Sequence, residues 1–397
     1  MKIGLITGEY PPQQGGVGDF TRELARALIA AGHEAQVITT AAGGQPSAAG
    51  QRQDDEVAVQ RVVTAWGMRC WGEIAEVVGP QQLDVLNIQY EPAAYAMQVG
   101  VNFLPSAWAR RRVKLPIVTT FHDLLVPYLF PKAGPLRWKV VKYLARHSAG
   151  VIVTNAEDHA RLSNLQPPIS SLRVVPIGSN IDPSKMGEGD RAAARGRWGI
   201  HPGDLVLGYF GFLNLSKGGS DLMQALKTLS DSGLPVKLLL IGGRTGSSDP
   251  TNADYAVQVD RLIESLGVTE RVIATGYVDT REVSRALAGC DVMVLPYADG
   301  ASLRRGSLLA AIAHGKAIVT TRPRYPIEGL EHEESALYVP AHDSQALAAA
   351  ARQVLLDSTL RSRLENGASE AARLYTWDRI AAQTVDAFEA ALRPRSM

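Results

Sequence analysis

The chain has few cysteines, no long apolar run and almost no net charge. Only two of its 397 residues are cysteines, Cys70 and Cys290, and both lie in apolar surroundings far apart in the sequence. Such a pair predicts neither a disulfide framework nor a zinc site, so a reducing cytoplasm is the expected compartment. The formal net charge of +1 argues against nucleic acid as the main partner.

No apolar run approaches the roughly 20 residues that a membrane-spanning helix requires. Residues 1–10 lead directly into an expected strand and lack the pattern of a signal peptide. We therefore expect a cytoplasmic protein, with the inner face of the membrane as a second location. The histidines are scattered without a ligand-like pair, so no bound metal is expected.

What the chain does have is a regular alternation of apolar, strand-length runs with amphipathic, helix-length segments. This pattern predicts an α/β fold with two Rossmann-like, doubly wound domains that face a cleft. We expect domains at 1–182 and 183–376, joined by the segment 176–197, and a last helix at 377–397 that packs back on the first domain. The expected strands are 2–7, 35–39, 57–63, 85–89, 117–121, 150–154, 173–175, 205–210, 237–241, 272–275, 292–295 and 317–320.

The loop after the strand at 292–295 is the strongest candidate for a ligand site. It includes Ser302, Leu303, Arg304 and Arg305, and it leads into a helix expected at 303–313. Backbone N–H groups at a helix N-terminus favour an anion, and arginine forks bind phosphate through paired hydrogen bonds. The alternative is that the arginines are solvated and that Ser307 only caps the helix.

Lys217 follows the first strand of the second domain, next to Gly218 and Gly219. Glycines let the backbone approach a phosphate closely, and the lysine adds a positive charge at the same place. The spacing is not that of a Walker A loop, and a surface lysine at a helix start is the alternative interpretation.

Three positions in the first domain follow strands in the same way. Gly15 and Gly16 lie in a glycine-rich loop before a helix at 20–31, for which Asp19 is the expected N-cap. This loop lacks the GxGxxG spacing, so we do not interpret it as a dinucleotide site. Glu91 and His122 each end a strand. Glu91 and Asp19 are possible substrate contacts, and His122 is a candidate catalytic residue that bonds a substrate hydroxyl or acts in acid–base chemistry. A solvated glutamate and a capping histidine are the alternatives.

The segment 130–147 includes a helix expected at 136–147 that is basic and amphipathic. Cations near an anionic bilayer contribute ~1 kcal/mol each, so peripheral membrane contact is one interpretation. An ordinary surface helix with a buried apolar stripe is the other.

Taken together, these motifs resemble those of the retaining glycosyltransferases with the GT-B fold, in particular the family-four group. The similar stretches are GEYPPQQGGVGDF at 8–20, FHD at 121–123, VPIGSNID at 175–182, GFLNLSKG at 211–218 and the segment 286–321. The resemblance covers almost the whole chain.

This resemblance implies transfer of a sugar from a nucleotide-sugar donor to a glycan, lipid-linked or small-molecule acceptor. It implies no metal and no cofactor beyond the donor as cosubstrate. Gly16 would then donate to the diphosphate and Lys217 would neutralise it, while His122 would face the donor sugar. The base would lie near Gly276, Tyr277 and Val278.

The chain departs from the family pattern at three positions. Phe212 stands where the family has an arginine, and Ser302 and Ala310 stand where it has two glutamates. These changes leave the donor and the activity open. A catalytically silent relative that binds a partner and a sugar-nucleotide epimerase are therefore the alternative functions.

Overall fold

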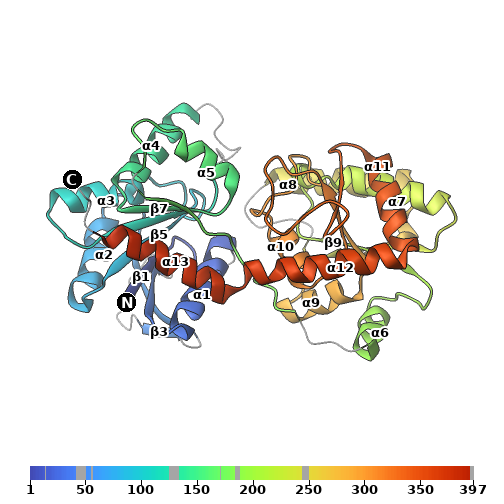
Figure 1. Ribbon diagram of the computed structural model, residues 1–397, viewed down its shortest axis with the longest axis horizontal. Helices are drawn as coiled ribbons and strands as arrows, with labels where there is room; N and C mark the ends of the chain where they lie inside the picture. Colours follow the sequence, from blue (N-terminus) through green and yellow to red (C-terminus); the bar gives the residue numbers. More distant parts are fainter. Residues whose placement is uncertain are drawn as a thin grey trace. The chain divides into compact units, whose positions relative to one another are not determined.

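The computed structural model describes residues 1–13, 15–41, 51–54, 57–124, 134–169, 171–183, 188–243 and 250–393. The chain forms two compact units (Figure 1). Unit 1 consists of Met1–Gly178 and Trp377–Met397, and unit 2 consists of Ser179–Thr376. The boundary therefore lies between Gly178 and Ser179, four residues before the expected one at 182/183.

Unit 1 contains one eight-stranded sheet with the order β3-β4-β2-β1-β5-β6-β7-β8. All neighbouring strands are parallel except β3, which is antiparallel to β4. The order reverses between β1 and β5, which is the position where open α/β sheets bind ligands. The strands are β1 Lys2–Ile6, β2 Glu34–Thr40, β3 Gln51–Asp54, β4 Val57–Val63, β5 Val85–Tyr90, β6 Ile117–Phe121, β7 Gly150–Val153 and β8 Leu172–Val174.

The helices of unit 1 cover both faces of this sheet. They are α1 Gly16–Ala30, α2 Cys70–Val78, α3 Gly100–Arg110, α4 Gly134–His147 and α5 Ala156–Ser163, together with α13 Trp377–Leu392 from the end of the chain. Five of them, α1 to α5, each connect two parallel strands, as a crossover between parallel strands requires.

Helix α13 belongs to unit 1 because it supplies part of that unit's core. Ile380 and Phe388 are fully buried in one apolar cluster with Ile3, Leu5 and Leu24. In Figure 1 this red helix lies beside α1 and over the sheet, and it contacts α1 and β7.

Unit 2 contains a six-stranded, fully parallel sheet with the order β11-β10-β9-β12-β13-β14. This is the Rossmann order, and it reverses between β9 and β12. Its strands are β9 Leu205–Phe210, β10 Val236–Ile241, β11 Val272–Ala274, β12 Val292–Leu295, β13 Ile318–Thr321 and β14 Leu337–Val339. Its helices are α6 Glu188–Arg197, α7 Gly219–Asp231, α8 Pro250–Ser265, α9 Thr280–Gly289, α10 Gly306–Ala313, α11 Ser344–Leu356 and α12 Ser358–Ala372.

Several local predictions are wrong. Helix α1 begins at Gly16 with Gly15 as its N-cap, so Asp19 lies in the first turn and is not the cap. Residues 188–197, which we assigned to the connection, form helix α6, because Arg191 and Arg195 bind the Asp291 carboxylate at 2.7 and 2.8 Å. Strands β3 and β14 and helix α5 are too short to show a clear period in the sequence.

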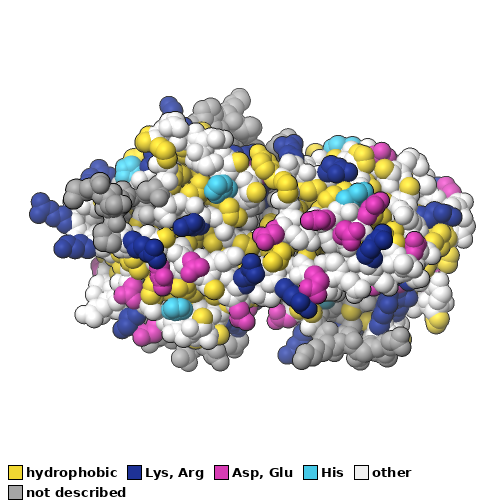
Figure 2. All heavy atoms as spheres, viewed as in Figure 1, with side chains coloured by type: hydrophobic (Ala, Val, Ile, Leu, Met, Phe, Trp, Pro, Cys, Tyr) yellow, Lys and Arg dark blue, Asp and Glu magenta, His cyan; other side chains and the backbone are white. Residues whose placement is uncertain are grey.

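The surface carries both signs of charge. On the face shown in Figure 2, Lys and Arg side chains are interspersed with Asp and Glu. Among the described residues, no helix is long and apolar enough to cross a membrane, and no three His, Cys, Asp or Glu side chains cluster as metal ligands. The segment 130–133 lies outside the described residues; Lys139 and Arg146 of α4 are exposed, and membrane contact through 130–147 stays a prediction.

Candidate functional site

In unit 2 the loops that follow β9 and β12 meet at the point where the strand order reverses. The Ala298 N–H donates to the Ser216 carbonyl at 2.9 Å, and the Arg305 Nη1 donates to the Ser216 Oγ at 3.2 Å. A Cβ on Gly218 would come within 1.9 Å of the Pro296 carbonyl oxygen, so only glycine allows this approach. The structure thus brings together two of the sequence-predicted loops.

Lys217 places its ammonium group inside this loop pair. A Cβ on Gly211 would lie 2.7 Å from the Lys217 Nζ, and the Nζ lies 6.0 Å from the centre of the Phe212 ring. Burial, and then the nearby Arg305 charge, lower the pKa of Lys217 to about 8. A desolvated ammonium beside a second cation favours binding of an anion.

The guanidinium of Arg305 is held in place before any ligand arrives. Its Nη2 donates to both carboxylate oxygens of Asp299, at 2.6 and 2.7 Å, and the guanidinium lies 5.2 Å over the Tyr297 ring. Because the Arg305 Nη2 is already bonded to Asp299, fewer of its N–H groups are free for phosphate than the sequence suggested. The sequence alone did not reveal that Asp299 pairs with Arg305, because the conformation of this loop brings the two side chains together.

Two helices begin at the same edge of the sheet. Helix α7 starts at Gly219, and the Ser220 N–H in its first turn donates to the Tyr255 hydroxyl at 3.1 Å. Helix α10 starts at Gly306, and its N-cap residue Arg305 makes no side-chain hydrogen bond to the helix. The positive end of the α10 dipole therefore suits an anion better than that of α7. Ser307 is not the cap; its Oγ lies 2.8 Å from the Tyr297 hydroxyl.

The remaining predicted donor residues also follow strands of this sheet. Ser302, Leu303 and Arg304 form the half-buried loop before α10. Residues 276–278 follow β11; Gly276 bridges to Gly242, and the Tyr277 side chain is 74% exposed. Ala310 is fully buried inside α10, so it offers no polar group to a ligand.

In unit 1, His122 ends β6 and lies under α1. Its ring packs edge-on against Phe20 at 4.7 Å, and Phe20 in turn contacts Trp377 at 5.3 Å. The His122 Nε2 lies 2.8 Å from the Gln89 Oε1. Burial lowers the pKa of His122 to about 3, so the imidazole is neutral at physiological pH.

A chain of amides assigns the tautomer of His122. The Asn87 Nδ2 donates to the Val118 carbonyl at 3.2 Å. This orients the Asn87 side chain so that its Oδ1 accepts from the Gln89 Nε2. The Gln89 oxygen therefore faces His122, and the histidine Nε2 must carry the hydrogen. One sequence feature indicates this amide chain: Asn87 and Gln89 are polar residues on the same face of an otherwise apolar, buried strand.

The N-terminus of α1 already holds a carboxylate. The Glu9 Oε1 accepts from the Val17 N–H at 2.9 Å and from the Gly18 N–H at 3.3 Å. A Cβ on Gly15 would lie 2.1 Å from the Glu9 carboxyl group, so a larger residue there would displace this carboxylate. A diphosphate at Gly15 and Gly16 would thus share this helix end with a fixed negative charge, and that site stays a prediction.

Replacing Glu9 by glutamine tests this competition. Burial is the main cause that raises the pKa of Glu9, so the folded state binds its proton more tightly than the unfolded state. We therefore expect Glu9→Gln to stabilise the fold at pH 7, and this gain to vanish as the pH falls and the wild-type carboxyl is protonated. If the loop binds diphosphate, the variant should bind nucleoside diphosphates roughly two- to fivefold more tightly.

Urea unfolding at several pH values and calorimetric titration with the diphosphate check both parts. Unchanged nucleotide affinity in Glu9→Gln would place the diphosphate away from this helix end.

The Glu91 carboxylate stabilises the turn that follows β5. Its Oε2 accepts from the Ala94 N–H at 2.9 Å, and burial is the main cause that raises its pKa, with Glu9 and Asp123 as further carboxylates that raise it. The structure therefore explains Glu91 without a substrate, although it lies at the same edge of the sheet as His122.

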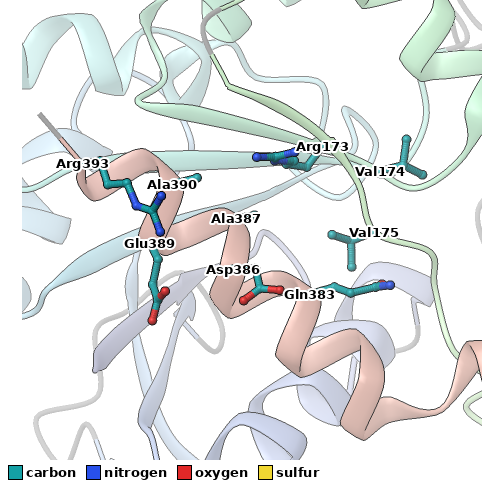
Figure 3. Close-up of a pocket in the computed structure, with 9 residues that line it drawn as sticks. All are labelled: Arg173, Val174, Val175, Gln383, Asp386, Ala387, Glu389, Ala390 and Arg393. Atoms are coloured by element: carbon teal, nitrogen blue, oxygen red, sulfur yellow. The ribbon is translucent and has the colours of Figure 1, made fainter. Parts of the chain in front are cut away.

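Unit 1 also has hollows away from these residues. One of about 390 Å³ lies between α13 and the end of β8, and Figure 3 shows Asp386 and Gln383 projecting from α13 towards it. None of the sequence-predicted site residues lines it. The predicted residues instead fall into two groups at the carboxyl ends of the strands, Gly15, Gly16, Asp19, Glu91 and His122 in unit 1 and all the others in unit 2.

Comparisons with known proteins agree with this architecture. Residues 15–178 match the family model of the glycosyl transferase 4-like domain, and residues 190–371 match that of glycosyl transferases group 1. The chain is similar to a D-inositol 3-phosphate glycosyltransferase of Xylanimonas cellulosilytica, with 27% identity over 72% of this chain and 69% of the relative. It is also similar to a phosphatidyl-myo-inositol mannosyltransferase of Mycobacterium leprae, with 25% identity over 98% and 96% of the two chains.

A solved structure has the same fold. Anabaena HepE, in complex with UDP and glucose, matches with a TM-score of 0.75 and 20% identity, covering 97% of this chain and 98% of the other. The two family models cover both units in the expected order. The chain therefore belongs to the GT-B glycosyltransferases of the family-four type.

Proposed function

We propose that the protein transfers a sugar from a nucleoside diphosphate sugar to an acceptor, with retention of the anomeric configuration and without a metal. One observation carries this proposal. Lys217 and Arg305 lie together at the strand reversal of unit 2, where helices α7 and α10 also begin. Two cations and the positive ends of two helix dipoles are thus concentrated at one place.

The chemistry needs such a field. During transfer the bond from the sugar C1 to the diphosphate oxygen breaks, a new bond forms from C1 to the acceptor oxygen, and the acceptor proton passes to the diphosphate. Negative charge develops on the leaving diphosphate. Cations and N–H groups already fixed at that place stabilise the charge without reorganisation.

The comparisons support a nucleotide-sugar donor and are compatible with several classes of acceptor. HepE binds UDP, and the two relatives are named for an inositol phosphate and a phosphatidyl-inositol acceptor. We accordingly propose a nucleotide-sugar donor and a glycan, lipid-linked or small-molecule acceptor for this chain. Because Ser302 and Ala310 lack carboxylates, hydroxyl groups of the donor must be held by other groups than in the family pattern.

The test is a thermal unfolding series with UDP, GDP, ADP and their sugar conjugates. A ligand at 100 times its Kd adds ~2.7 kcal/mol of stability. For a unit of this size that is roughly 5–10 °C in Tm. A shift with one nucleotide identifies the base, and donor turnover with the product anomer determined by NMR tests retention. Absence of any shift would instead favour the silent relative that binds a partner.

A further inference from the structure

We propose that a cavity in unit 1 binds the acceptor through an anionic group attached to an apolar chain, such as an alkyl or prenyl phosphate. Only the ligand's role as acceptor rests on the proposed function, since the chemistry of the ligand follows from the cavity itself. The cavity has a volume of about 280 Å³ and lies between the end of β5 and helices α3 and α4. Tyr90, Asn102 and Arg137 are its central polar side chains.

Arg137 brings an unpaired cationic group to this cavity. Among the described residues, its buried Nη1 has no hydrogen-bond partner, and its Nη2 donates to the Met97 Sδ at 3.8 Å. In the part of the chain that the structure describes, no carboxylate pairs with it. Arg137 is half-buried, and a guanidinium nitrogen withdrawn from water without a partner is costly, so the arrangement fits a site that is completed by an anion.

Tyr90 supplies a second donor. Its hydroxyl oxygen accepts from the Asn102 Nδ2 at 2.7 Å, so the hydroxyl hydrogen remains for a ligand. Both Arg137 and Tyr90 line the cavity, and the Arg137 charge lowers the pKa of Tyr90 against a larger rise caused by burial. A guanidinium fork and a phenol donor suit phosphate oxygens.

The other walls are apolar. Met97 and Val140 line the cavity, and Val99 and Leu136 contribute side chains that are 51% and 65% exposed. Exposed apolar side chains beside a buried cation select a ligand with an apolar group next to its charge. A purely hydrophilic sugar phosphate would leave these side chains without a partner.

The experiment is calorimetric titration of the full chain with hexyl phosphate, glucose 6-phosphate and hexanol. We expect hexyl phosphate to bind most tightly, and Arg137→Leu to weaken it about 10- to 100-fold, the range for a lost charged hydrogen bond. The matched control is Lys139→Leu, which removes one exposed cation from the same helix and should leave binding unchanged. Val140→Phe, which fills the cavity and keeps the charge, should also weaken binding and serves if Arg137→Leu fails to fold.

Three outcomes would overturn the proposal: no binding of hexyl phosphate, equal binding in wild type and in both cavity variants, or equal affinity for glucose 6-phosphate. Titration with a nucleoside diphosphate separates this proposal from the proposed function. Arg137→Leu should keep its nucleotide affinity, because that site belongs to unit 2. If the protein binds hexyl phosphate but no nucleotide, the cavity proposal holds and the proposed glycosyltransferase activity does not.

Discussion

Lys217→Met should abolish sugar transfer while making the protein more stable. Removing one fixed donor to a developing anion costs about 10²–10³ in rate, and Lys217 carries a full charge at the strand reversal of unit 2. We expect kcat to fall by at least about 100-fold and nucleoside diphosphate affinity to fall with it. Initial rates of donor consumption, with calorimetric titration of the nucleotide, measure both.

The stability gain follows from the pKa of Lys217, which burial lowers to about 8 from an ordinary value of 10.5. At pH 7 the wild type must keep a charged amine in a desolvated place, so the variant should be more stable by about 1–3 kcal/mol. That difference should close as the pH rises from about 8 to 10.5, where the folded lysine is neutral and the unfolded one is still charged. By the same logic, kcat/KM of the wild type should decline above about pH 8.

The matched control is Lys227→Met in α7. Lys227 forms a surface pair with Asp231 and lies outside the loop pair. Its loss should leave transfer within about twofold and change stability by less than about 1 kcal/mol. Transfer retained within tenfold in Lys217→Met would exclude this lysine as the group that neutralises the diphosphate.

The strands were predictable because burial on both faces leaves a short, continuous apolar run. Strands β9 and β12 begin and end at the expected residues for this reason. Helix α6 was not predictable, since its sequence is polar and glycine-containing and it depends on ion pairs to Asp291, nearly one hundred residues away. Tertiary contacts of that kind leave no periodic trace in the sequence.

The site was predictable in the same partial way. The places of Lys217, Arg305 and His122 at the carboxyl ends of strands were predictable, because each follows a strand and parallel strands end at a common edge. Their partners were not found: Asp299 neutralises Arg305, and Glu9 occupies the N-terminus of α1. Such partners depend on loop conformation and strand register, and they decide how much charge remains for a ligand.

If His122 faces the donor sugar, as the resemblance implies, His122→Ala should slow transfer at least about tenfold through the loss of one hydrogen bond. Since burial lowers the pKa of His122 to about 3, the wild-type rate should show no acidic limb near pH 6.5. The folded state binds this proton more weakly than the unfolded state, so the free energy of unfolding should fall as the pH drops from about 6.5 towards 3. Rates and urea unfolding across this range check both statements.

Gln89 provides the sharper variant, because it determines which histidine nitrogen carries the hydrogen. Gln89→Glu places a carboxylate 2.8 Å from the His122 Nε2, which should raise the pKa of His122 and create an acidic limb in kcat/KM. Gln89→Leu should lower kcat without that limb, because the Nε2–H loses its acceptor. Ser148→Ala is the control, since it breaks a buried hydrogen bond to Thr119 of β6, the strand that His122 follows, and should cost stability only. A pH profile of Gln89→Glu that matches the wild type would show that the tautomer of His122 has no part in the reaction.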